Sequence, residues 1–181
     1  SDNVNAGTHT DSFFRQTANI NISAYNPWVP IGDITNNFSG SFDGNGFYIN
    51  GLTISTSADN QGLFGYVTAP TTAVTLENIN LVNINVSGGY NTGGLAGYVN
   101  GTGAGVTITN CSVSGTSSVS GVESVGGLTG YASVATITDC NAAVTLTSTS
   151  KNIGGFAGFI ANVTITGCYA TGSVQGAALY I

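Results

Sequence analysis

The stretch that decides the fold is residues 94–111, which read GLAGYVNGTGAGVTITNC. It opens with a Gly-Leu-Ala-Gly-Tyr phrase and closes with a Val-Thr-Ile-Thr-Asn-Cys phrase. Close copies of the two phrases recur in the same order at residues 62–66 and 74–79, at 127–131 and 135–140, and at 155–159 and 163–168. The first phrase therefore starts again after 32, 33 and 28 residues. Two different phrases that keep one order at one approximate period indicate a repeat architecture.

The second phrase has the pattern of a half-buried β-strand, because apolar and polar residues alternate in it. Val, Ile and Thr dominate these stretches, and Gly, Ser and Asn separate them. A repeat of about 30 residues with short strands and no helix predicts a β-solenoid, in which equivalent residues stack at about 4.8 Å. An antiparallel sandwich gives no reason for matched cysteines, and propeller blades usually need about 40 or more residues.

A solenoid predicts inward columns of equivalent apolar residues, one from each coil. The predicted columns are Leu76, Ile108, Ile137 and Ile165; Ile79, Cys111, Cys140 and Cys168; and Leu63, Leu95, Leu128 and Phe156. In-register side chains point the same way, which suits a disulfide torsion badly. We therefore expect buried free thiols, which behave as small apolar groups, with a single disulfide as the alternative.

The composition excludes several classes of function. Only 6% of the 181 residues are charged, whereas a typical soluble domain is about a quarter charged. Two cations, Arg15 and Lys151, cannot neutralise a run of nucleic-acid phosphates or hold the chain on an anionic membrane. No apolar run approaches the length that spans a bilayer, so we expect no nucleic-acid binding and no membrane insertion.

The two ends of the chain differ from the repeats. Residues 1–56 lack the two phrases and are expected to form a cap and the first coil, with strands at 19–23 and 47–54. Residues 57–181 are expected to form one continuous repeat domain, so that the whole chain holds about five coils. Val125, Ile153 and Ile181 are spaced 28 residues apart, so the chain stops where a further repeat would begin. This end is predicted to be a stacking edge, with Leu179 and Ile181 as its contact residues.

The Gly-rich phrases followed by Thr-Ile-Thr-x-Cys resemble the GLUG repeats of large bacterial and archaeal surface proteins. Such repeats occur in adhesins of the filamentous haemagglutinin kind and beside IgA-specific metallopeptidases. Residues 14–16, 28–32 and 42–46 resemble the coil that usually precedes the repeats. The resemblance covers nearly the whole chain; Gln61 and Phe159 depart from it, in place of a Gly and a Tyr. It implies a right-handed parallel β-helix on an exported protein, and it implies no activity.

The outward columns are the predicted surface-binding residues. They are Thr75, Thr107, Thr136 and Thr164, and beside them Thr109, Thr138 and Thr166. Ranks of Thr-x-Thr resemble those of ice-binding β-helices, but Thr is also simply favoured on exposed strands, and Glu77 interrupts the second column. A further column, Tyr66, Tyr98, Tyr131 and Phe159, predicts an aromatic stack with a structural role rather than a sugar platform.

No catalytic, cofactor-binding or metal-binding residue is predicted. Asp43-Gly44-Asn45-Gly46 could suggest a calcium loop, but Ile54 stands where an EF-hand needs Glu, so a turn is favoured. A glycosidase needs two facing carboxylates, and the sequence gives no reason for Asp33 and Asp43 to meet. A polysaccharide-acting β-helix enzyme remains a remote alternative.

The predicted function is that of an extracellular, non-enzymatic structural or adhesive module, such as an adhesin stalk or a matrix or fibre component. An ice-binding β-helix is the main alternative. The expected partners are a glycan or protein surface and the chain itself, through end-to-end stacking or continuation of a longer chain.

Overall fold

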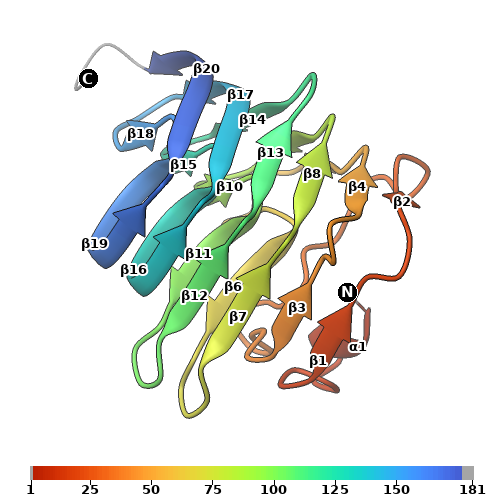
Figure 1. Ribbon diagram of the computed structural model, residues 1–181. Coiled ribbons are helices and arrows are strands. Elements are labelled where there is room, and N and C mark those ends of the chain that lie inside the picture. Colours follow the sequence, from red (N-terminus) through yellow and green to blue (C-terminus); the bar gives the residue numbers. More distant parts are fainter. Residues whose placement is uncertain (1, 177–181) are drawn as a thin grey trace.

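A computed structural model of the chain describes residues 2–176, and short parallel β-strands make up nearly all of its regular structure. The exception is one helical turn, α1 (Asp2–Asn5). Within residues 2–176 the strands pair in parallel and stack along one axis, from β1 at the N-terminal end to β19 and β20 at the other (Figure 1). The predicted fold class, an all-β parallel solenoid, is confirmed.

Sheet 1 carries both phrases of each repeat. Its described strands pair in the order β1, β3, β7, β12, β16, β11 and β6, and β19 also pairs with β16. Their bounds are β1 (Phe13–Arg15), β3 (Ser41–Asp43), β6 (Phe64–Thr68), β7 (Val74–Glu77), β11 (Ala96–Asn100), β12 (Val106–Thr109), β16 (Thr129–Thr138) and β19 (Ala157–Thr166). The order turns back at β16 because this long strand pairs with β11 along one half and with β12 along the other.

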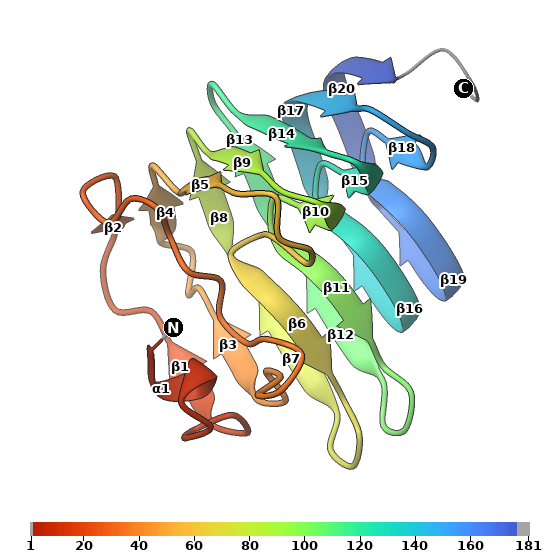
Figure 2. The same ribbon diagram turned by 180° about the vertical axis from the view of Figure 1, so that it is seen from behind.

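Sheet 2 and the smaller sheet 3, which has strands only in the last three described coils, form the other sides of the solenoid and are best seen from behind (Figure 2). Sheet 2 contains β2 (Ile20–Asn21), β4 (Tyr48–Asn50), β5 (Thr53–Ser55), β8 (Asn80–Val82), β9 (Asn85–Ser87), β13 (Ser112–Ser114), β14 (Ser118–Gly121), β17 (Asn141–Ser148) and β20 (Tyr169–Gly176). Sheet 3 contains β10 (Tyr90–Gly93), β15 (Glu123–Gly126) and β18 (Ile153–Gly154).

Strands β16 and β19 are long because they lack the loop that separates the corresponding two strands in earlier coils. Residues 69–73 separate β6 from β7 and residues 101–105 separate β11 from β12, and both loops project from the lower edge in Figure 1. In β16 and β19 a single residue with positive φ, Val134 (49°) or Asn162 (55°), takes the place of the loop. This loss of loop residues accounts for most of the shortening of the last period to 28 residues.

The structure has about six coils, one more than the sequence predicted. In sheet 1 six strands follow one another as parallel neighbours: β1, β3, β7, β12, β16 and β19. Two of these six strands, β1 and β3, lie within residues 1–56. Phe42 of β3 pairs with Leu76 in the inward column without the Thr-Ile-Thr phrase around it, so the repeat spacing did not reveal the additional coil.

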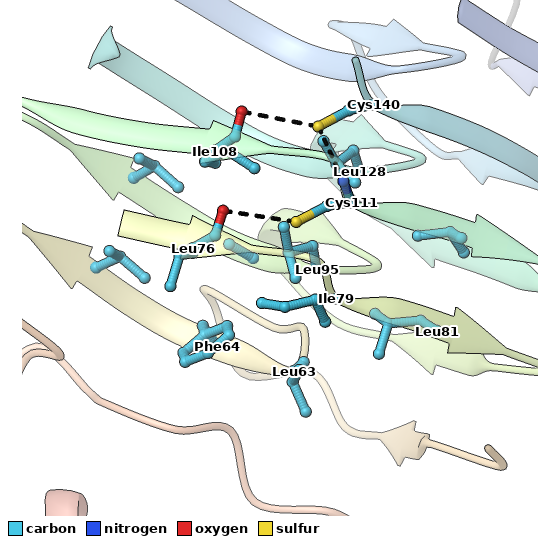
Figure 3. Close-up of a cluster of buried hydrophobic side chains, with 14 of the residues drawn as sticks. Leu63, Phe64, Leu76, Ile79, Leu81, Leu95, Ile108, Cys111, Leu128 and Cys140 are labelled. Carbon is cyan, nitrogen blue, oxygen red and sulfur yellow. Dashed lines mark hydrogen bonds between the residues drawn. The ribbon is translucent and has the colours of Figure 1, made fainter. Parts of the chain in front are cut away.

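The predicted inward columns form the core of the coils before the last described one, in which Ile165 is exposed and Phe156 and Cys168 are partly buried. Leu76, Ile108 and Ile137 are aligned by parallel pairing, and none exposes any surface. Figure 3 shows Cys111 and Cys140 stacked above Ile79, in one buried cluster with Leu63, Leu95 and Leu128 of the Gly-rich phrases. Each coil buries its apolar residues only against the coils next to it, as expected for a solenoid.

Two strand predictions in the N-terminal segment are wrong in extent. Residues 47–54 form two strands, β4 and β5, because Gly51 turns the chain with φ of 79° and Leu52 then points into the core. The predicted strand at 19–23 is reduced to β2, because the Ser23 N–H donates to Asn21 Oδ1 at 3.0 Å and forms a turn there.

The N-terminal end is closed by apolar side chains. Val4 of α1 and Phe38 are buried, and Trp28 is half-buried, with its indole N–H donating to the Leu63 carbonyl at 3.3 Å. Such a covering is what an exposed solenoid end needs. Within the described residues, no helix is long and apolar enough to cross a membrane.

Candidate binding face

The predicted threonine columns lie in register on the outer face of sheet 1. Parallel pairing aligns Thr75, Thr107, Thr136 and Thr164, and beside them Glu77, Thr109, Thr138 and Thr166. The columns are half-buried in the earlier coils, and they are exposed at Thr136, Thr164 and Thr166. We call these two columns the threonine face. It is a surface of hydroxyl and methyl groups that opens towards the last coils.

Some hydroxyl groups of the threonine face are already engaged within the protein. The Thr138 hydroxyl donates to Thr109 Oγ1 at 2.9 Å. The column that contains Thr109 and Thr138 is acidic at its N-terminal end, because it continues through Glu77 to Asp43 in register. The remaining hydroxyls can donate and accept hydrogen bonds, so the face suits a neutral, hydroxyl-rich ligand better than a charged one.

The threonine face is stepped and not flat. A hollow of about 340 Å³ lies where the long loops give way to single residues. Thr107, Thr136 and Thr164 contribute to its lining, together with Ala73 and Gly105 from the two loops. The step follows from the change in loop length, which the spacing of the phrases records only as a shorter period.

The predicted aromatic stack is confirmed. The ring centroids of Tyr66 and Tyr98 are 4.3 Å apart, those of Tyr98 and Tyr131 4.7 Å, and those of Tyr131 and Phe159 5.2 Å, with interplanar angles of 15°, 3° and 7°. Because the rings cover each other's faces, mainly their edges remain for a ligand. Burial and the neighbouring tyrosines raise the pKa of Tyr98 to about 12, so its hydroxyl stays protonated at neutral pH.

Asparagine ladders at the corners of the coil were not predicted. Asn78, Asn110 and Asp139 take the left-handed conformation, with φ of 56°, 50° and 52°. The Asn110 amide donates to Asn78 Oδ1 at 2.8 Å, and the Asn78 amide donates to Asp43 Oδ1 at 2.9 Å. The signal was present in the sequence, since Asn, Asp or Gly precedes each member of the Ile79–Cys168 column, and these residues tolerate positive φ.

The three cysteines are free thiols, as favoured from the sequence, and they form a ladder. The backbone N–H of Cys111 donates to Cys140 Sγ at 3.3 Å, and the N–H of Cys140 donates to Cys168 Sγ at 3.4 Å. Cys111 and Cys140 are buried, whereas Cys168 in the last described coil is only partly covered. Burial raises the pKa of the Cys111 thiol, which lowers its reactivity further.

This difference in exposure predicts selective modification. In the native chain a small water-soluble thiol reagent should modify Cys168 rapidly and leave Cys111 and Cys140 unmodified, because only the thiolate of an accessible cysteine reacts. Intact mass after a short incubation should show one adduct, and incubation in denaturant should show three. Replacing Cys168 with Ser should abolish the rapid adduct. A native chain that gains two or more adducts at one rate would contradict the ladder.

The carboxylate of Asp43 is held by several neighbouring groups. Asp43 is nearly buried; Arg15 Nε lies 3.2 Å from Asp43 Oδ2, and the Asn45 N–H donates to Oδ1 at 2.7 Å. The turn predicted for this segment is therefore confirmed, with Asn45 at φ of 54°. The hydrogen bond from the Asn78 amide, with further help from Asn45 and Arg15, lowers the pKa of Asp43 from its ordinary value of 3.8.

The lowered pKa of Asp43 predicts a pH-dependent contribution to stability. A carboxyl group with a lower pKa in the folded state stabilises the fold above its unfolded pKa, and this contribution is lost as the pH falls through the folded value. An Asp43→Asn variant should thus have a lower free energy of unfolding than the parent at pH 7. This difference in free energy, called the gap below, should shrink below about pH 4. Urea unfolding followed by Trp28 fluorescence measures the gap. A gap that stays constant down to pH 2.5 would show that the charge of Asp43 contributes nothing.

The other carboxylate raised as a candidate, Asp33, lines a groove whose lining does not include Asp43. Asp33 Oδ1 accepts hydrogen bonds from the backbone of Thr35 and Asn36, both at 2.7 Å. Asp33 lines a mainly apolar groove of about 660 Å³ beside Trp28, and Asp59 lines the same groove. Asp59 Oδ1 accepts a hydrogen bond from a backbone N–H at 2.8 Å. Across residues 2–176 no group of three or more His, Cys, Asp or Glu side chains is arranged to hold a metal ion.

The residues predicted as the stacking edge, Leu179 and Ile181, lie outside the described residues. The last described coil consists of β18, β19 and β20, which pair with the preceding coil on one side.

Comparison with known proteins gives one similar sequence and one similar structure. No protein-family model matches the chain. The chain is 38% identical to halomucin of Haloquadratum walsbyi over 153 residues, which cover 77% of this chain and 2% of halomucin. A solved structure from Bacteroides ovatus, described as a candidate immunoglobulin A1 protease, has a TM-score of 0.59 and 19% identity. That likeness covers 91% of this chain and 60% of the other, and it supports the fold alone.

Proposed function

We propose that the chain is a non-catalytic segment of an extracellular surface protein, in which GLUG-type coils act as a stalk or matrix element. The observation that carries the proposal is the continuity of the ladders. The same columns of core, threonine, aromatic and corner residues run from coil to coil, which gives a regular spacer. The similarity to halomucin supports a place in a much longer protein, since the matched part is 2% of halomucin.

The placement of the carboxylates supports a structural role over a catalytic one. Asp43 and Glu123 each lie beside a cation, Arg15 at 3.2 Å and Lys151 at 3.8 Å. Asp33 accepts backbone hydrogen bonds within a local turn, and Asp59 accepts one from the backbone N–H of Tyr90 in the next coil. A general acid or a nucleophile needs a carboxyl group that is free to face a substrate.

An adhesive role would use the threonine face. Its hydroxyl groups, the edges of the tyrosine rings and the near absence of charge suit a neutral glycan or an uncharged protein surface. Long-range electrostatic attraction would contribute little, so binding should depend only weakly on salt.

The proposed function is tested by incubating the chain with a panel of polysaccharides and with immunoglobulin A1, and following cleavage by chromatography. We expect no products. The matched control is an Asp33→Asn, Asp59→Asn variant, which removes both carboxylates of the N-terminal groove. Products formed by the parent chain and lost in this variant would establish an enzyme and refute the proposal.

Ice binding is the second candidate, and the register of the threonine columns favours it. Thr107 and Thr109 stack on Thr136 and Thr138, and these on Thr164 and Thr166. The step beside the loops reduces the flat area that could order water. The Thr109–Thr138 hydrogen bond also engages hydroxyl groups that could otherwise bind water. Partitioning into slowly growing ice tests this candidate. Enrichment in ice that is lost in a Thr136→Lys, Thr164→Lys variant would establish it, and exclusion from ice would refute it.

A further inference from the structure

The N-terminal groove, about 660 Å³ in volume, lies between two segments of the chain. Its lining comes from residues 27–34 and 54–61, with Asn5 beside them. None of the lining residues belongs to the threonine face. Val29 is 56% exposed and Ile34 is 74% exposed, so apolar side chains stand open to solvent here. The volume is within the usual range for ligand pockets.

One edge of β5 is only partly paired where it borders the groove. β5 pairs with β9 on one side and ends the order of sheet 2 in the described residues. The Leu52 carbonyl and the Thr56 N–H bond towards β9, so Thr53 and Ser55 direct their backbone groups to the other side. There the Trp28 N–H donates to the Thr53 carbonyl at 2.8 Å. The backbone of Ser55 has no hydrogen-bond partner within residues 2–176.

This edge is open because of residues inside the chain. In the later coils β9 and β14 follow β5 as parallel neighbours. The segment of the first coil that lies beside β5 contains Pro27 and Pro30, which have no backbone N–H to donate to a sheet. It forms no strand and reaches β5 through Trp28. The groove therefore takes the place of a strand that the first coil lacks.

The groove presents carboxylates without a countercharge. Its described lining includes Asp33 and Asp59 but no Lys, Arg or His. Each carboxylate uses Oδ1 to accept backbone hydrogen bonds, and the Oδ2 atoms have no partner in the described part of the chain. The two cations of the chain, Arg15 and Lys151, each lie beside a different carboxylate. A ligand that brings its own positive charge complements this lining.

Gln61 adds a nearly buried acceptor to the groove. Its side chain is 7% exposed, and Gln61 begins a column that continues to the fully buried Thr92. Gln61 Nε2 donates to the Asp59 carbonyl at 2.6 Å, whereas Oε1 accepts no hydrogen bond from the residues described. Buried polar atoms usually have a partner. Since Gln61 lines the groove, a donor on a bound ligand can supply one.

We propose that the N-terminal groove binds an extended, cationic peptide segment of a partner protein. The peptide pairs with the open edge of β5 at Ser55 and places Lys or Arg side chains near Asp33 and Asp59. The aliphatic parts of these side chains pack against the ring of Trp28. Main-chain hydrogen bonds to a sheet edge supply affinity, and contacts to the side chains supply specificity. Unlike binding to the threonine face, this binding weakens as the salt concentration rises.

The experiment uses Trp28, the only Trp of the chain, as a fluorescent reporter in the groove. The probe is an acetylated and amidated hexapeptide of alternating Val and Lys, and the control peptides carry Gln or Glu in place of Lys. We expect a saturable change in fluorescence with the Lys peptide and none with the Glu peptide. The affinity should fall about tenfold or more when sodium chloride rises from about 50 mM to about 500 mM.

Two variants separate the groove from general attraction to an acidic chain. Asp33→Asn with Asp59→Asn keeps the Oδ1 acceptors and removes both charges, so the affinity should fall about tenfold or more. The matched control, Glu77→Gln with Glu123→Gln, removes as many charges outside the groove and should bind like the parent. Equal weakening in the two variants, or no weakening in the first, would overturn the proposal.

Backbone pairing is tested with two N-methylated forms of the Lys peptide, one methylated at the odd residues and one at the even residues. Alternate N–H groups of a strand face its neighbour, so one form should lose about tenfold or more in affinity and the other should bind like the parent peptide. Equal affinities would overturn the pairing with β5. So would the absence of binding by both fluorescence and calorimetry. A salt-independent response of Trp28 to xylohexaose in place of the peptide would show a glycan site and refute the proposal.

Discussion

A chain that carries Gly130→Val should lose more than about 4 kcal/mol of stability, or fail to fold, because the new side chain has no space. A β-carbon at Gly130 would meet the backbone at Asn91 and Thr92 of the preceding coil, closer than real β-carbons approach. Backbone atoms of a packed corner cannot move aside as a flexible side chain can. Circular dichroism and urea unfolding would record the loss.

The matched control for Gly130→Val is Gly176→Ala. A β-carbon at Gly176 would lie 3.3 Å from Ile153 Cγ2, a methyl group that can adjust, and we expect a change within about 1 kcal/mol. A Gly130→Val chain that unfolds within 1 kcal/mol of the parent would show that the corners are not packed as described. Gly97 and Gly158 meet the same backbone positions of earlier coils, which explains why the second glycine of the phrase recurs.

The second large effect is expected for Ile137→Ala, at about 2–5 kcal/mol. Ile137 is fully buried between Ile108 and Ile165 of the neighbouring coils, so truncation removes apolar contacts on both sides and leaves a cavity. The same substitution at Ile165 serves as the control. That residue occupies the same column but is 39% exposed, so Ile165→Ala should cost less than half as much.

Urea unfolding at pH 7 measures both isoleucine variants against the parent. The ratio of the two losses is more informative than either value, because the residue type, the strand and the column are the same. Equal losses at the two positions would mean that the last described coil is covered in solution as fully as the coil before it. A small loss at Ile137 would contradict the continuous core.

The sequence was sufficient to predict the fold because its signals are periodic. The Thr-Ile-Thr-x-Cys phrase fixes which side chains point inward, and the inward positions Ile108, Cys111 and Ile137 are all buried. The tyrosine stack and the free thiols follow from the same register. A repeated phrase carries this information because each coil must match its neighbour.

Features that do not repeat were harder to predict. The strands β1 and β3 lack the phrases, so the repeat spacing did not count them, and Gly51 divides one expected strand into two. The asparagine corners depend on backbone conformation, which the alternation of polar and apolar residues does not report. The step on the threonine face depends on loops whose length changes between coils, which the repeated phrases themselves do not show.

The central claim is that successive coils pair in parallel and in register, and nuclear Overhauser contacts between backbone protons test it most directly. We predict contacts from Thr107 to the Thr136–Ile137 pair, and from Thr136 to the Thr164–Ile165 pair, repeated at the spacing of the coils. Parallel neighbours show contacts between amide and α-protons of adjacent strands. Close pairs of α-protons between these segments would instead mark antiparallel strands and would contradict the solenoid.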